Sequence, residues 1–515
     1  MVELQKEQAR TLSDEEKQQD SKPAATDRQH DTDSSGGPQA SSDKIPSDLE
    51  RTLVTWNGPE DPLNPRNWPR GRKWRALIAV SGFVLMSPLS TTIVAPSLEV
   101  IAQELNITNA IQKVLVLSIF LLGFGIGPLF IGPLSEIFGR IRVLQLFNAM
   151  YLAFNTGCGF AKTKEQLIVL RFLSGLFGSA SVGIGAGTIG DMFDASERGK
   201  AMAVYSVAPL VGPTIGPIAG GFLTEYASWR WSFWLASIIN AFVQIWGFFF
   251  LEETYSPTIL QQKKQHLEQE GKTNLYTEHD LGSKREVAKV NMVRPLKLLA
   301  TQPVVQVLAI YQGYLYGNIY IIYAYFPNLW TGQYHQRVSI ASLNYLSLGI
   351  GTVFAAEATT HINDRIYKFF KARNNGEGRP EFRVPIMIPA TVLLAVGLFW
   401  YGWSAQTHMH WIMPNIGIAI FTAAAYACTI SNNTYIVDTY GRYSASGLAA
   451  ISLLRCLAGF AFPMFSSYMY DALDYGWTNS MLGFIALGIG LPAVLLLWRY
   501  GRLLRQKSPY CAIKE

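Results

Sequence analysis

Runs of about twenty apolar residues recur along this chain, and they restrict its fold more than any other feature. A run of that length is what an α-helix needs to cross about 30 Å of hydrocarbon. Because no water reaches the backbone there, each run must satisfy its own amides and carbonyls, which a helix does. Charged residues make up 16% of the 515 positions, against roughly a quarter in soluble proteins. The chain is therefore predicted to be an all-α, polytopic membrane protein.

The apolar runs form two groups of six. We expect membrane spans at residues 76–97, 113–131, 143–161, 167–189, 201–223, 231–251, 303–327, 340–360, 384–404, 411–434, 444–466 and 478–498. Two such groups around a midplane cavity are the architecture of many secondary transporters. We therefore predict twelve transmembrane helices in two pseudo-symmetric six-helix bundles. The expected divisions are a disordered cytoplasmic tail at 1–72, bundles at 73–252 and 303–500, a cytoplasmic linker at 253–302, and a cytoplasmic tail at 501–515.

Lysine and arginine residues set the expected orientation, because cytosolic loops are enriched in them. If every span crosses, the basic clusters before span 1, after spans 2, 4, 8 and 12, and in the linker all fall on one side. Both termini and the linker are therefore placed in the cytosol. The sequon at Asn106 then lies in the first outer loop, which suits glycosylation.

Several classes of protein find no support in the sequence. The net charge of +6 reflects the basic loops rather than a surface for nucleic acid. No phosphate-binding loop of the GxxxxGK[ST] type is present, so ATP hydrolysis by this chain is not expected. The four cysteines lack the spacing of metal ligands, and no nucleophile–base cluster is evident. We expect neither an enzyme nor a cofactor or metal.

The loop after span 2 reads GPLSEIFGR and combines turn-forming glycines with charges of both signs. Gly132 and Gly139 permit a tight turn, and Glu136 precedes Arg140 by four residues, so the carboxylate can pair with the arginine or with a helix end. The pattern resembles the loop between helices 2 and 3 of the major facilitator superfamily. That resemblance implies a cytosolic charge latch between the two halves. At the pseudo-symmetric place, HINDRIYK (361–368) offers the charges without the glycines.

Span 5 contains VGPTIGPIAGGF (211–222), a stretch unusually rich in glycine and proline for a helix. Glycines spaced by four share one helical face and let a neighbouring helix approach closely, while prolines bend the helix. The stretch resembles the antiporter motif of the superfamily's drug:proton antiporters, matched at Gly212, Gly216, Pro217, Gly220 and Gly221. The resemblance implies that the chain exchanges its substrate for protons. The alternative is a helix-packing face with no bearing on the direction of transport.

Charged residues inside predicted spans are candidates for function, because burying a charge in a bilayer costs several kcal/mol. Arg171 resembles the superfamily's helix-4 arginine, which the family links to proton transfer, and Arg455 lies near the middle of span 11. Span 1 has no acid before Glu99, so it offers no proton carrier. We take Glu357 in span 8 as the candidate carrier, since burial would raise its pKa. Asp191 and Asp438 close spans 4 and 10 and are either functional or interfacial.

Span 7 reads YQGYLYGNIYIIYAYF and places aromatic and polar groups on one helical face. Its two central tyrosines lie too deep for an interfacial belt. An aromatic face with polar tips suits an amphipathic ligand, although core packing is an equal alternative. The cavity candidates, two of them from span 10, are Gln312, Tyr316, Tyr320, Tyr323, Asn432 and Asn433.

The run TWNGPEDPLNPRNWP (55–69) is similar to the segment before helix 1 in fungal members of the twelve-helix drug:proton antiporter family. SERGKAMA (196–203) and YIVDTYGRYSASGLAA (435–450) add to the resemblance, which covers roughly residues 52–500. It implies a plasma-membrane pump, with the vacuolar membrane as an alternative. We therefore expect a monomeric exporter of a small amphipathic compound in exchange for protons. The rival interpretations are an importer or proton symporter on the same fold, and a non-transporting membrane receptor.

Overall fold

The computed structural model describes residues 52–277, 284–506 and 508–511. Residues 1–51 of the tail predicted for 1–72 therefore lie outside the described residues. The described residues form one compact unit of packed helices. Ten helical segments within the described residues are long and apolar enough to cross a bilayer. The predicted all-α membrane fold is confirmed.

The first half contains all six of its predicted spans. Its long helices are α2 (Arg70–Thr92), α4 (Ala110–Phe138), α5 (Arg140–Cys158), α6 (Lys164–Gly178), α7 (Ala180–Met192), α8 (Ala195–Tyr226) and α9 (Arg230–Phe250). The predicted fourth span is divided into α6 and α7. Two short elements follow α2, the 3-10 helix η2 (Ala95–Ser97) and α3 (Leu98–Glu104).

The second half repeats this pattern. Its helices are α12 (Pro303–Asn328), α13 (Val338–Leu343), α14 (Tyr345–Arg373), α15 (Met387–Gln406), α16 (Ile412–Tyr440), α17 (Ser444–Ala461), α18 (Pro463–Ile485) and α19 (Leu491–Gln506). The short elements between them are η4 (Leu329–Gln333), η5 (Pro380–Arg383), η6 (Gly441–Tyr443) and η7 (Ala486–Gly490). Asp474 has φ 52° and interrupts α18, so α18 contributes to both of the last two spans.

Two predicted spans, α5 and α12, are not among the ten segments selected by length and hydropathy. Both helices are long enough, but polar side chains lower their mean hydropathy: Asn148 and Asn155 in α5, Gln312 and Asn318 in α12. All four of these side chains are buried against other helices. Burial inside the bundle removes the need for an apolar surface, and so hydropathy alone misses these helices.

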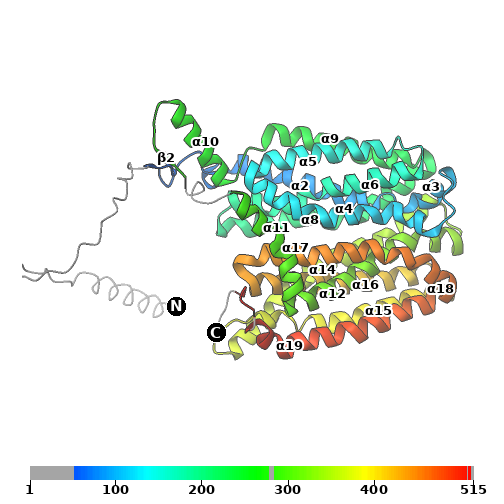
Figure 1. Cartoon of the computed structure of the whole chain (residues 1–515). Coiled ribbons are helices and arrows are strands. Elements are labelled where there is room, and N and C mark those ends of the chain that lie inside the picture. Colours follow the sequence, from blue (N-terminus) through cyan, green and yellow to red (C-terminus); the bar gives the residue numbers. More distant parts are fainter. Residues whose placement is uncertain (1–51, 278–283, 507, 512–515) are drawn as a thin grey trace, which may run out of the picture. The chain divides into compact units, whose positions relative to one another are not determined.

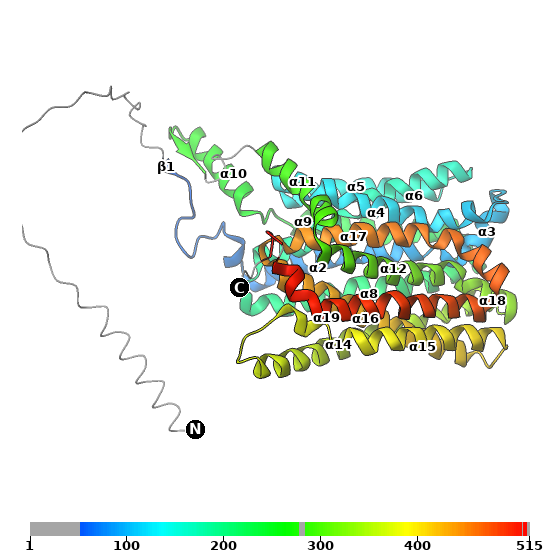
Figure 2. The ribbon, with the colours of Figure 1, turned by 60° about the horizontal axis from the view of Figure 1, so that its bottom comes forward.

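The described part of the linker is structured and lies at one end of the helices. It comprises α10 (Ser256–Gln269), β2 (Leu275–Tyr276) and α11 (Lys284–Thr301). Figures 1 and 2 show α10 and α11 at the end where α19 finishes, while α3 and the interrupted α18 lie at the opposite end. We call these the linker end and the opposite end.

Residues 52–69 differ from the disordered tail expected for 1–72. The strand β1 (Thr52–Leu53) pairs in parallel with β2, and a 3-10 turn, η1, spans Pro65–Asn67. Asp61 is buried, accepts the backbone amides of Asn57 and Leu63, and lies 3.6 Å from Lys263 of α10. Burial raises the pKa of Asp61, but these amides and the ammonium outweigh it, so the pKa lies below its ordinary value. These contacts to a distant segment give the polar run its structure.

Candidate functional site

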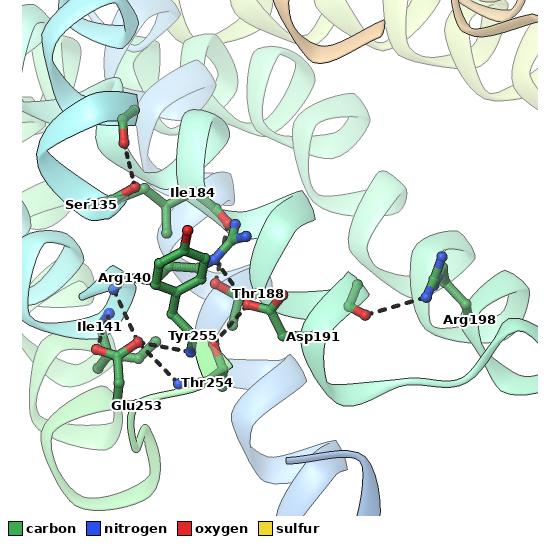
Figure 3. Close-up of polar contacts among 12 residues, drawn as sticks. Ser135, Arg140, Ile141, Ile184, Thr188, Asp191, Arg198, Glu253, Thr254 and Tyr255 are labelled. Carbon is green, nitrogen blue, oxygen red and sulfur yellow. Dashed lines mark hydrogen bonds and ion pairs between the residues drawn. The ribbon is translucent and has the colours of Figure 1, made fainter. Parts of the chain in front are cut away.

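A cluster of charged and polar groups lies at the linker end of the first half (Figure 3). Gly139, with φ 97°, forms the turn between α4 and α5, and it places Arg140 at the start of α5. The Arg140 Nε lies 2.8 Å from a carboxylate oxygen of Asp191, near the end of α7. Both side chains are only about one-fifth exposed, at 20% and 19%, so water screens this ion pair weakly.

Glu253, just after α9, holds the same turn from the other side. Its carboxylate accepts the backbone amides of Arg140 and Ile141 at 3.0 and 3.2 Å, which caps the start of α5. It also accepts the amides of Thr254 and Tyr255. The Tyr255 ring lies 5.1 Å from the Arg140 guanidinium. The sequence analysis missed Glu253, although an acid directly after an apolar run in a chain with few acids was an available signal.

The structure brings only part of the predicted latch together. Glu136 accepts a hydrogen bond of 2.7 Å from the Asn291 side chain of α11, whereas the acidic partner of Arg140 is Asp191. At Gly139 an added Cβ would meet the Glu253 carboxylate, but at Gly132 it would meet nothing within 4 Å. Gly139 is therefore required by local geometry, and Gly132 is not.

An equivalent cluster occupies the linker end of the second half. Arg383, in η5 before α15, contacts Asp364 of α14 at 2.7 Å and Asp438 of α16 at 3.1 Å. Glu381 of η5 pairs with Arg505 near the end of α19 at 2.7 Å, and both are buried. In each half, these contacts join the start of the third span to the end of the fourth span and to the end of the sixth span. The charges at 361–368 indicated this place, but Arg383 and Glu381 were missed.

The glycine face of α8 is in close contact with α2. An added Cβ at Gly212 would lie 3.0 Å from the Leu89 nitrogen, and one at Gly216 would lie 2.8 Å from the Leu89 oxygen. One at Gly220 would overlap the Ile93 carbonyl, and one at Gly221 would overlap Ser342 of α13 in the second half. The close helix packing expected from the spacing is present. The stretch therefore contacts the backbone of α2 and also reaches the other half of the molecule.

Arg171 is fully buried and bonds backbone carbonyls where α2 ends. Its Nε donates to Val116 of α4 at 3.1 Å, and its two terminal nitrogens donate to Ser90 and Thr91 at 2.9 and 3.3 Å. The last carbonyls of a helix have no partner within it. Arg171 supplies partners for two of them, so it joins α2, α4 and α6 at this depth.

The predicted aromatic face of α12 is a continuous row of rings. Ring centroids lie 4.9 Å apart for Tyr316 and Tyr320, and 5.6 Å apart for Tyr320 and Tyr323. The row continues to Tyr345 of α14, whose ring lies 5.8 Å from that of Tyr323. The Arg455 guanidinium of α17 lies 4.7 Å from the centre of the Tyr316 ring. This row, with Arg455, is called the tyrosine row below.

The polar candidates beside the tyrosine row differ in their surroundings. Gln312 and Asn432 are fully buried and hydrogen-bonded to each other at 2.9 Å. Gln312 also donates to Thr429 of α16, so these amides hold α12 to α16. Asn433 is partly exposed. The structure thus places the Gln312–Asn432 pair in the core between helices, and the tyrosine row beside it.

Two predicted positions lie on the surface. Glu357 is 82% exposed and 2.9 Å from His361 on the same helix, so the burial on which its role as proton carrier was predicted is absent. Glu357 is exposed rather than buried because this part of α14 faces outward. Asn106 is exposed in the turn after α3, with φ 53°. It lies at the end opposite the linker, and its glycosylation stays a prediction.

The fold and these sites define a class: a membrane protein of two related six-helix halves that meet along α4, α8, α13 and α17. Residues 80–463 match the sequence model of the Major Facilitator Superfamily. This chain belongs to the Major Facilitator Superfamily.

Known proteins similar to the chain are transporters rather than enzymes. The efflux pump vrtL of Penicillium aethiopicum is 45% identical over 467 residues, which cover 90% of this chain and 93% of the relative. The efflux pump radE of Floropilus chiversii is 36% identical and covers 91% and 88% of the two chains. The crystal structure of a D-xylose-proton symporter has a TM-score of 0.61 at 15% identity, covering 83% of this chain and 97% of the other. That likeness concerns the fold alone.

Proposed function

We propose that this chain is a secondary active transporter that exports a small amphipathic compound in exchange for protons. The observation that carries this proposal is the glycine face of α8, which contacts the backbone of α2 and reaches α13. It occupies the positions matched by the antiporter motif. The names of the fungal relatives, efflux pumps among them, support export rather than import.

The proposed cycle moves the two halves against each other around a central site. At the opposite end, Glu225 of α8 accepts the backbone amide of Ser339 in α13 at 2.8 Å, which joins the halves there. At the linker end, α11 contacts the first half through Asn291 and Glu136, and the Arg294 guanidinium lies 5.0 Å from the Tyr443 ring of the second half. Export requires the contact at the opposite end to open while the clusters at the linker end keep each half rigid.

We also propose that the linker end, with both termini, lies in the cytosol, and the basic clusters of the short loops support this orientation. We propose the plasma membrane as the location, with the chain working as a monomer. Because Glu357 is exposed, we assign the coupling role to groups near Arg171 and Arg455 rather than to Glu357.

The test uses purified protein in sealed liposomes with an imposed pH gradient. Amphipathic cations, polyamines and aromatic acids are screened for uptake, with protein-free liposomes as the control for passive trapping. Uptake driven by an acidic lumen and abolished by a protonophore is expected. Movement driven only by the compound's own gradient would show a facilitator, and movement driven by an acidic exterior would show a symporter. Either result would contradict the proposed exchange of the compound for protons.

A further inference from the structure

The interior of the two halves carries arginine charge without matching carboxylates. Arg171 and Arg455 lie within α6 and α17, well away from the helix ends. Among the described residues, Asp191, Asp364, Glu381 and Asp438 form ion pairs near the linker end, and Glu357 is exposed. Other carboxylates lie toward the opposite end, in α3, at the end of α8 and in α18: Glu99, Glu225, Asp471 and Asp474. The central region therefore has an excess of positive charge.

The two arginines differ in what they contact. Arg171 directs three of its nitrogens at backbone carbonyls and is held in place by them. The Arg455 Nε is buried and has no hydrogen-bond partner among the described residues. Its guanidinium lies against the Tyr316 ring and is close to the Cys456 thiol. The Arg455 Nε–H is therefore a donor for which the described residues provide no acceptor.

Arg455 is partly buried, and a charge held within a membrane span without a counter-ion is unfavourable. The cation–π contact with the Tyr316 ring offsets only part of this cost. An anionic ligand would offset much more, because a planar guanidinium forms strong paired hydrogen bonds with carboxylates and similar anions. The geometry thus favours a negative group beside Arg455.

The position of Arg455 makes it part of a shared surface between the halves. An added Cβ at Gly125 of α4 would lie 2.6 Å from Cys456 Cβ, so α17 meets the first half directly beside Arg455. The tyrosine row continues from there, because an added Cβ at Gly459 of α17 would lie 3.0 Å from both Leu121 of α4 and Tyr316. Aromatic faces next to a cation suit a planar, conjugated ligand with an acidic substituent.

We propose that Arg455, Tyr316 and Tyr320 bind the substrate, and that the substrate is an aromatic compound with a group that is anionic at neutral pH, such as a carboxylate or an acidic phenol. This inference rests on the proposed function, because it names the class of compound exported. It distinguishes this chain from a carrier of organic cations, for which a buried carboxylate would be the expected partner.

The experiment compares two xanthene dyes of similar shape and opposite charge, anionic fluorescein and cationic rhodamine 123. Binding to the purified full chain in detergent is measured by equilibrium dialysis, with empty micelles as the control. The wild type should bind fluorescein more tightly than rhodamine 123. Arg455→Gln should weaken fluorescein about tenfold or more, since a charge-assisted hydrogen bond contributes about 1.5–3 kcal/mol. It should leave rhodamine 123 unchanged or tighter.

Arg455→Lys is the matched variant, since it keeps the charge and loses the planar fork, and it should restore part of the fluorescein affinity. Preference of the wild type for rhodamine 123, no binding of fluorescein, or equal losses of both dyes in Arg455→Gln would each overturn the anion site. The assay does not depend on transport. Arg455-dependent fluorescein binding together with no proton-driven exchange in liposomes would reject the proposed function and leave this inference standing.

Discussion

Arg140 owes its position to three groups that are distant in the sequence. Asp191 supplies its counter-charge, Glu253 caps the helix that it begins, and Tyr255 covers the guanidinium. An added Cβ at Gly187 of α7 would overlap the guanidinium, so a side chain there would displace Arg140 from this position. The local motif alone suggested Glu136 as the partner, since it is four residues away. The α4 helix continues to Phe138, so Glu136 instead lies beside α11.

Exchanging Asp191 for asparagine tests whether Asp191 or Glu136 is the partner that stabilises Arg140. Asp191→Asn leaves the Arg140 charge in a partly buried site without its carboxylate, and we expect a loss of about 1–3 kcal/mol in stability. Glu136→Gln, the control, should stay close to the wild type, because Glu136 contacts an amide at the surface. The measurement is thermal unfolding in detergent. A larger loss of stability for Glu136→Gln than for Asp191→Asn would indicate that Glu136 is the main partner of Arg140.

At the scale of the element, α8 shows why glycines are tolerated in a membrane helix. Three prolines lie inside the helix, and yet it runs without a break from Ala195 to Tyr226. Its glycines face the backbone of α2, so the neighbouring helix supplies packing that side chains would otherwise provide. The spacing of four predicted the face, but it did not identify α2 as the partner.

Two alanine substitutions in α8 test this packing. Gly220→Ala places a methyl group against the Ile93 carbonyl, and we expect a loss of about 1–3 kcal/mol from overpacking, with slower transport. Gly199→Ala is the control, because an added Cβ there meets nothing within 4 Å. Better helix propensity should make it neutral or up to about 1 kcal/mol more stable. Thermal unfolding and flux are measured for both, and indistinguishable effects would contradict a tight α2–α8 contact.

At the scale of the whole molecule, the halves meet at mid-depth through α4 and α17 and at the opposite end through α8 and α13. Cys456 is buried at the first of these contacts, so it reports on their separation. The hydrogen bond from Ser339 to Glu225 belongs to the second. Alternating access requires both contacts to open during the cycle.

Removing the Glu225 carboxylate should favour the state that is open at the opposite end. In a chain whose other cysteines are changed to serine, Glu225→Ala should make Cys456 react several-fold faster with a membrane-impermeant maleimide added outside, because the halves lose a contact that holds them closed. Glu165→Ala, which changes an exposed acid at the same end, is the control. Unreactive Cys456 in all variants would mean that the halves do not separate, as in a non-transporting receptor.

The sequence by itself determined the membrane class, the two groups of six helices and the packing face of α8, because these depend on periodicity and length within one segment. It also located the tyrosine row, since one helical face carries all its α12 members. The tertiary structure alone decided which charges meet. Asp191 rather than Glu136 joins Arg140, Arg383 lies between two aspartates, and Glu357 is exposed. Such pairings depend on the rotation of each helix and on the distance between helix ends, which no single segment encodes.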